Sequence, residues 1–208
     1  MRNERMAATL VGVLYIIGTV SGVASAIVSG GLPGAAGPAG ATTASVTALL
    51  ILVMGVALAL IPAVLFPIVK RESEALAVGY VIFRGAVEML TYVAVALCWL
   101  MVGVVGDLVL KAVEPMLALQ NIVFAIGGLM LYYAMYRMRL VPRWLSGWGF
   151  AACVLYLAAG VLAIFTASPT ALLMPLAVQE MVMAVWLIAR GFGADAGVAR
   201  GGVQAAAA

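Results

Sequence analysis

The residues best suited to chemistry in this sequence are an arginine and two glutamates that interrupt long apolar stretches. Arg84 and Glu88 are four residues apart, so in a helix their side chains lie on one face. Glu180 interrupts a later apolar stretch and follows Gln179 directly. Because an isolated charge is costly to bury, we expect these side chains to face one another and not the apolar surroundings.

The charges of this set do not balance. Arg84 carries one positive charge, whereas Glu88 and Glu180 carry two negative charges. The second carboxylate must therefore bind a proton, share the arginine or meet a cation from outside. Burial and a neighbouring like charge both favour the protonated form of a carboxyl group. The set predicts a site that binds or transports a small polar, ionic or amphiphilic ligand, together with a proton as one option.

Two adjacent amides extend the predicted site. Gln120 and Asn121 follow Pro115 closely enough to lie about 8–9 Å beyond it in a helix, a depth similar to that of Glu88 in an antiparallel neighbour. Tyr80, Thr91 and Tyr92 lie along the same stripe as Arg84. We predict one polar cluster from the third, fourth and sixth apolar segments, with these candidate ligand-binding residues: Arg84, Glu88, Gln120, Asn121, Gln179 and Glu180.

The same residues allow two alternatives. A buried Arg–Glu–Glu network can lock helices in register in a structural or assembly protein, since polar groups between membrane helices contribute about 0.6 kcal/mol each. A glutamate could also act as acid or base in an intramembrane enzyme with a lipid-like substrate. The enzyme is less favoured, because the chain has no histidine and no C-x-x-C, P-loop or H-E-x-x-H motif. We expect no metal and no cofactor.

The composition identifies the surroundings of this site. The chain has 208 residues, of which 66% are apolar and 9% are charged. Soluble domains have about 45–50% apolar and about 25% charged residues, so the chain lacks the charge that a water-facing surface needs. We predict an all-α integral membrane protein whose main partner is the lipid bilayer. The net charge of +3 is too small to suggest nucleic acid.

Six segments reach the length of about 20 apolar residues that a membrane-spanning helix needs. We expect residues 1–190 to form a single six-helix membrane domain and residues 191–208, rich in Gly and Ala, to form a disordered cytoplasmic tail. The expected transmembrane helices are Met6–Val28, Ser45–Val69, Ala75–Val105, Pro115–Tyr136, Trp144–Thr166 and Thr170–Ala189.

Basic residues set the expected orientation. All but two of the eleven basic residues fall on the side of the N-terminus, and the exceptions are Arg84 and Lys111. The positive-inside rule therefore places both termini in the cytoplasm. Residues 1–26, which end in Ala24-Ser25-Ala26, also resemble a signal peptide. We favour a retained helix because the apolar run continues to Val28. The basic residues of the cytoplasmic side are Arg2, Arg5, Lys70, Arg71, Arg137, Arg139, Arg143, Arg190 and Arg200.

A G-x-x-x-G motif occurs in the first apolar segment. Gly18 and Gly22 allow close helix packing, either within the chain or between two copies in a homo-oligomer. Such motifs are common by chance in apolar sequence, and we favour packing within the chain.

Several short motifs resemble a known family. They are Gly12-x-Leu14-Tyr15, Phe83-Arg84-x-x-x-Glu88, Arg139-Leu140-Val141-Pro142-Arg143-Trp144-Leu145 and Gln179-Glu180-Met181. Together they resemble domain-of-unknown-function family 4386 over roughly residues 5–193. The resemblance implies a bacterial multi-pass protein of the inner (cytoplasmic) membrane with no established activity. It also implies that Arg84, Glu88 and Glu180 fall on motif positions of the family.

Overall fold

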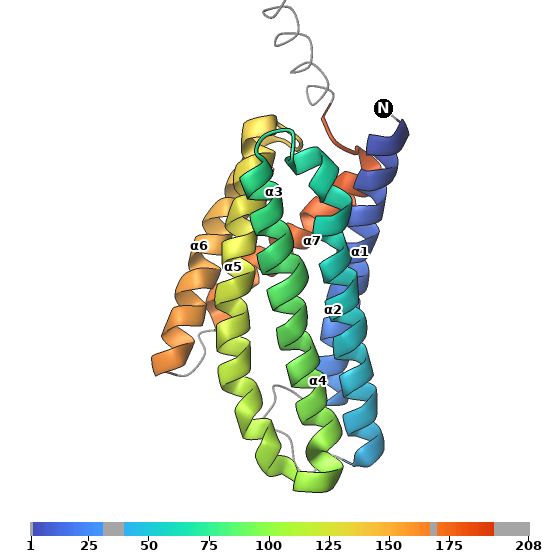
Figure 1. The fold of residues 1–208 in the computed structure, drawn as a ribbon, viewed down its shortest axis with the longest axis vertical. Coiled ribbons are helices and arrows are strands. Elements are labelled where there is room, and N and C mark those ends of the chain that lie inside the picture. The colour runs from blue at the N-terminus through green and yellow to red at the C-terminus, as the bar shows by residue number, and fades with distance from the viewer. Residues whose placement is uncertain (1, 31–39, 167–169, 194–208) are drawn as a thin grey trace, which may run out of the picture.

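All the regular secondary structure in the described part of the chain is helical. The computed structural model describes residues 2–30, 40–166 and 170–193. The elements are α1 (Arg2–Val28), α2 (Ala41–Val69), α3 (Glu74–Tyr80), the π-helix η1 (Val81–Val87), α4 (Glu88–Val105), the 3₁₀-helix η2 (Asp107–Ala112), α5 (Val113–Met138), α6 (Arg143–Phe165), the 3₁₀-helix η3 (Thr170–Leu172) and α7 (Met174–Ala189). Because α3, η1 and α4 follow one another without a break, they form one long helix, and the described residues make the predicted bundle of six helices (Figure 1).

Five of these helices are long and apolar enough to cross a membrane. They are Asn3–Val28, Ala41–Val69, Glu74–Val105, Leu108–Met138 and Arg143–Phe165. The sixth, α7, has only 16 residues and extends about 24 Å, which is less than the roughly 30 Å of a bilayer core. It is shorter than the predicted segment from Thr170 because the chain forms the separate turn η3 before Pro175 starts the helix. The five long helices indicate a membrane protein.

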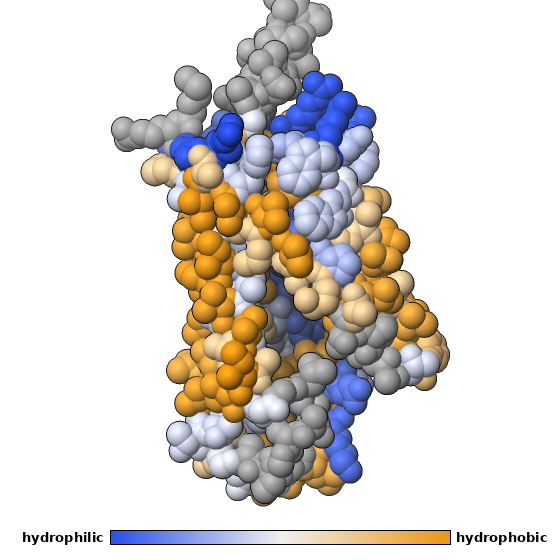
Figure 2. Space-filling view, turned by 180° about the vertical axis from the view of Figure 1, so that it is seen from behind, coloured by the Kyte–Doolittle hydropathy of each residue, from blue (hydrophilic) through white to orange (hydrophobic). Residues whose placement is uncertain are grey.

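The helices form a closed ring at one end of the bundle. Helix α1 packs against α2 and α7, and α6 packs against α5 and α7. The long helix of α3, η1 and α4 lies between α2 and α5. Figure 1 shows α7 behind this helix, towards the end where the N-terminus lies, so it covers only part of the bundle's length. Figure 2, seen from behind, shows a hollow below this cover with hydrophilic surface inside it.

Glycines bring neighbouring helices into close contact. A Cβ added at Gly18 would lie 2.7 Å from Leu58 of α2, and a Cβ added at Gly22 would lie 2.7 Å from Met54 of the same helix. The G-x-x-x-G face therefore packs within the chain. Helix α6 approaches α5 in the same way, because a Cβ at Gly149 would lie 2.3 Å from the Tyr132 ring.

Charged side chains tie the helix ends together at the end of the bundle that holds the N-terminus. Arg71 forms an ion pair with Glu4, and Arg137 Nε lies 3.2 Å from Glu72 Oε1. The Arg5 guanidinium donates to the carbonyl oxygens of two residues near the end of α7. The basic residues in these contacts lie at one end of the bundle, which corresponds to the predicted basic side and is blue at the top of Figure 2. Arg200 lies outside the described residues, as does most of the predicted tail.

Candidate functional site

Arg84 lies on the π-helical segment in the middle of the long third helix. In this segment the backbone N–H of Glu88 donates to the carbonyl oxygen of Phe83, five residues earlier. Such π-turns inside α-helices are rare and occur frequently at functional sites. Helix α5 comes close to the same place through Gly127, where an added Cβ would lie 3.3 Å from Arg84 Cβ. The backbone thus holds Arg84 deep within the bundle.

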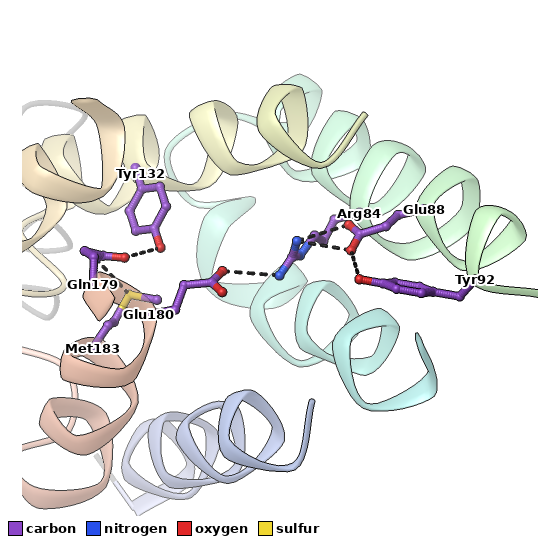
Figure 3. A network of polar contacts seen from close by, with 7 residues as sticks. All are labelled: Arg84, Glu88, Tyr92, Tyr132, Gln179, Glu180 and Met183. Carbon is purple, nitrogen blue, oxygen red and sulfur yellow. Dashed lines mark hydrogen bonds and ion pairs between the residues drawn. The ribbon is translucent and has the colours of Figure 1, made fainter. Parts of the chain in front are cut away.

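Arg84 and Glu88 form a buried ion pair, as Figure 3 shows. Arg84 Nη1 lies 3.2 Å from Glu88 Oε1 and 3.1 Å from Oε2. The Tyr92 hydroxyl donates to Oε1 of the same carboxylate over 3.1 Å. The exposed fraction of the side chain is 2% for Arg84 and 0% for Glu88. The guanidinium carbon also lies 3.9 Å from the centre of the Phe124 ring, a favourable cation–π distance.

Glu180 of α7 reaches the same arginine from the opposite side. Its Oε1 lies 3.4 Å from Arg84 Nη2, which is longer than the contacts of Glu88. Its side chain is 14% exposed. Arg84 therefore lies between two carboxylates, one enclosed and one partly open (Figure 3). The structure brings together the three charged residues singled out from the sequence, and their formal charges sum to one negative charge.

Gln179 forms a separate polar contact next to this cluster. Its side-chain oxygen accepts a hydrogen bond of 2.7 Å from the Tyr132 hydroxyl, and its nitrogen donates to the Leu145 carbonyl oxygen over 3.1 Å. Figure 3 shows this group on the far side of Glu180 from Arg84. Gln179 thus connects α7 with α5 and α6 and makes no hydrogen bond to the charged residues.

The two amides of α5 lie away from the charges. Gln120 lines a cavity described below, and the Cβ of Asn121 faces Gly160 of α6, 3.1 Å from the position of an added Cβ there. Phe124 is the α5 side chain that reaches Arg84, and Gln120 precedes it by one turn of the helix, about 6 Å. The predicted cluster takes polar side chains from the third, fourth and sixth helices. In the structure, the charged side chains come from the third and sixth helices, and the fourth helix contributes an aromatic ring.

The predicted stripe of hydroxyl groups is also divided. Tyr92 belongs to the cluster, whereas Thr91 donates to the carbonyl oxygen of Glu88 within its own helix. The hydroxyl of Tyr80, one turn before Arg84, is buried and makes no hydrogen bond to the charged residues. Sequence reasoning did not identify Phe124 and Tyr132, since aromatic residues at helical spacing are ordinary in a core.

The arrangement suits electrostatic binding better than metal chemistry. Within the described ranges, no group of three or more Cys, Asp or Glu side chains lies close enough to hold a metal ion. The cluster offers one carboxylate with a partly open side, an arginine fixed by two carboxylates and an aromatic ring. These groups can hold a small ligand by charge and hydrogen bonds.

Comparison with known families confirms the resemblance seen in the sequence. The family described as "Domain of unknown function (DUF4386)" matches residues 10–191, which include every residue of the charged cluster. No curated protein and no solved structure matches the chain.

Proposed function

The chain belongs to the DUF4386 family, and we propose that it is a membrane receptor or carrier that binds a small polar or ionic ligand at Arg84, Glu88 and Glu180. The observation that carries the proposal is the excess negative charge of a cluster with one positive and two negative side chains, buried between helices. A charge buried without compensation is strongly unfavourable. A ligand that supplies positive charge would relieve this cost.

The contacts support different roles for the carboxylates of Glu88 and Glu180. Glu88 receives Arg84 through both oxygens and Tyr92 through one of them, and it is fully enclosed. Glu180 meets the arginine through one oxygen over a longer distance and keeps an exposed edge. Glu180 is therefore the group that can exchange its partner, and the Arg84–Glu88 pair is the fixed wall beside it.

The charge balance favours a cation among the polar and ionic ligands. Either an organic ammonium group or a proton would supply the positive charge. A site inside an apolar bundle also suits an amphiphilic ammonium, whose alkyl part can remain among apolar side chains.

The proposal is tested by thermal unfolding of the purified protein in lipid nanodiscs, with tetramethylammonium, ethylammonium and acetate as probes. We expect a saturable rise in the unfolding temperature with an ammonium probe and none with acetate. Glu180→Gln should abolish the rise, whereas Glu114→Gln, an exposed glutamate at the start of α5, should leave it unchanged. A rise that persists unchanged in both Glu180→Gln and Arg84→Ala contradicts the proposal. A rise that appears only on acidification of the unmodified protein, and is lost in Glu180→Gln, assigns the site to a proton.

The second candidate function is structural. The closed geometry of Arg84, Glu88 and Tyr92 is that of a clasp within the long helix, and Glu180 extends it to α7. This candidate predicts that the protein with Arg84→Met, Glu88→Gln and Glu180→Gln together remains folded and fully active in its host. Loss of ammonium binding in that variant would instead favour the receptor.

A further inference from the structure

A cavity lined by uncharged residues lies in the half of the bundle that is further from the basic end. Its volume is about 160 Å³, and residues of α1, α2, α4 and α5 line it. Thr47 comes from the first turns of α2, Trp99 from the outer half of α4 and Gln120 from the outer half of α5. This is the half that α7 does not cover in Figure 1. The cavity is thus lined by four helices, and Arg84, Glu88 and Glu180 do not line it.

Three polar groups that belong to residues lining this cavity are buried without hydrogen bonds. They are the Thr47 hydroxyl, the Trp99 indole N–H and the Gln120 side-chain oxygen, none of which has a partner in the described part of the chain. The exposed fractions of these residues are 1%, 1% and 7%. Buried polar groups are nearly always paired in folded proteins, because an unmade hydrogen bond is costly. Three unpaired groups from three helices beside one cavity indicate that a molecule bound there completes them.

We propose that this cavity binds a neutral hydroxyl compound about the size of phenol. The described residues that line it carry no charge, which disfavours an ionic ligand. Trp99 needs an acceptor and Gln120 needs a donor, and a single hydroxyl group supplies both. A cavity of roughly 150 Å³ accommodates a benzene ring. Apolar residues such as Ile51, Val95 and Leu117 complete the lining and suit a ring or a short alkyl group.

This site is distinct from the charged one. Tyr92 touches both, since it lines the cavity while its hydroxyl donates to Glu88. The groups that would bind the neutral ligand belong to α2, α4 and α5, whereas Glu180 belongs to α7. The inference therefore stands independently of the proposed function, and Glu180→Gln should leave binding in the cavity unchanged.

The test uses the indole N–H signals of the full-length protein in nanodiscs. The chain has four tryptophans, so the Trp99 signal can be assigned by its loss in Trp99→Phe. We expect phenol to shift this signal saturably and benzene, which has the same ring without a hydroxyl, to have little effect. The proposal is overturned if phenol does not shift the Trp99 signal. It is also overturned if phenol and benzene shift this signal equally.

A matched pair of variants tests the hydrogen bond itself. Gln120→Leu should weaken phenol binding by about fivefold or more, as expected for a lost hydrogen bond. Asn121→Leu changes the neighbouring amide, which faces α6, and should bind phenol like the unmodified protein. Equal affinity in the two variants contradicts the assignment. If Gln120→Leu does not fold, Thr47→Val provides the same comparison, and the phenol and benzene titrations of the unmodified protein remain decisive.

Discussion

At the scale of single residues, Arg84 is the side chain on which the charged cluster depends. It lies between Glu88 and Glu180, with its guanidinium carbon over the Phe124 ring. Removal of one member of a buried ion pair leaves the other charge without compensation, which costs more than replacement of the whole pair by neutral groups. A larger loss of stability on removal of one charged residue than on replacement of all of them therefore distinguishes a charged cluster from ordinary polar packing.

We expect Arg84→Met to lower the free energy of unfolding by about 3–5 kcal/mol, because two carboxylates then lie buried without a cation. The protein that also carries Glu88→Gln and Glu180→Gln should recover most of this loss. Reversible unfolding in mixed micelles measures both. An Arg84→Met protein as stable as the unmodified one would show that the carboxylates do not need the arginine.

The Tyr132 hydroxyl offers a second test at this scale. Tyr132→Phe removes the donor to Gln179 and leaves a buried amide oxygen unpaired, so we expect a loss of about 1–3 kcal/mol in the free energy of unfolding. Tyr133→Phe changes the next residue, which is 46% exposed, and should have little effect. Similar unfolding curves for the two variants would indicate that the hydrogen bond contributes nothing.

At the scale of the elements, the sequence predicts what lies within one helix better than what lies between helices. The spacing of Arg84 and Glu88 predicts their shared face, and the lengths of the apolar runs predict six spanning helices, five of which are long enough in the structure to cross a membrane. Residue spacing and run length do not show how α5 is rotated about its axis relative to its neighbours. Gln120 and Asn121, which were expected in the cluster, therefore lie elsewhere. The π-turn at Arg84 was also not predictable, because apolar residues with ordinary α-helical spacing surround it.

The close contact of α5 and α6 is testable through two glycines of one helix. Gly149→Ala places a methyl group against the Tyr132 ring, 2.3 Å from the nearest ring atom, and should destabilise the protein by about 1–3 kcal/mol. Gly147→Ala meets no atom within 4 Å and should be neutral or slightly stabilising, as alanine favours helix. Thermal unfolding of both variants gives the comparison, and an equal effect would contradict the packing.

At the scale of the whole molecule, the charged side chains and the apolar surface are separated. Ion pairs and basic side chains gather at one end, and large apolar side chains such as Val104 and Ile27 remain exposed along the helices. From the positive-inside rule we expect the basic end to face the cytoplasm. The short helix α7 lies towards that end and covers only part of the bundle's length (Figure 1).

We expect Gly40→Cys to react with a membrane-impermeant maleimide in right-side-out vesicles and Glu74→Cys to react only after permeabilisation. Gly40 precedes α2 at the end opposite the basic one, and Glu74 begins α3 at the basic end. Both positions are exposed, whereas the native Cys98 and Cys153 are buried and should give little background. The reverse labelling pattern would invert the orientation.

The central claim, that Glu180 is the exchangeable carboxylate of a charged cluster, is tested most directly by carboxyl ¹³C spectra of the protein during titration with tetramethylammonium. The chain has only eight acidic residues, and Glu180→Gln and Glu88→Gln assign the two signals of interest. The account predicts that the Glu180 signal shifts saturably while the Glu88 signal shifts much less. A Glu180 signal that moves no more than that of the exposed Glu74 would contradict it.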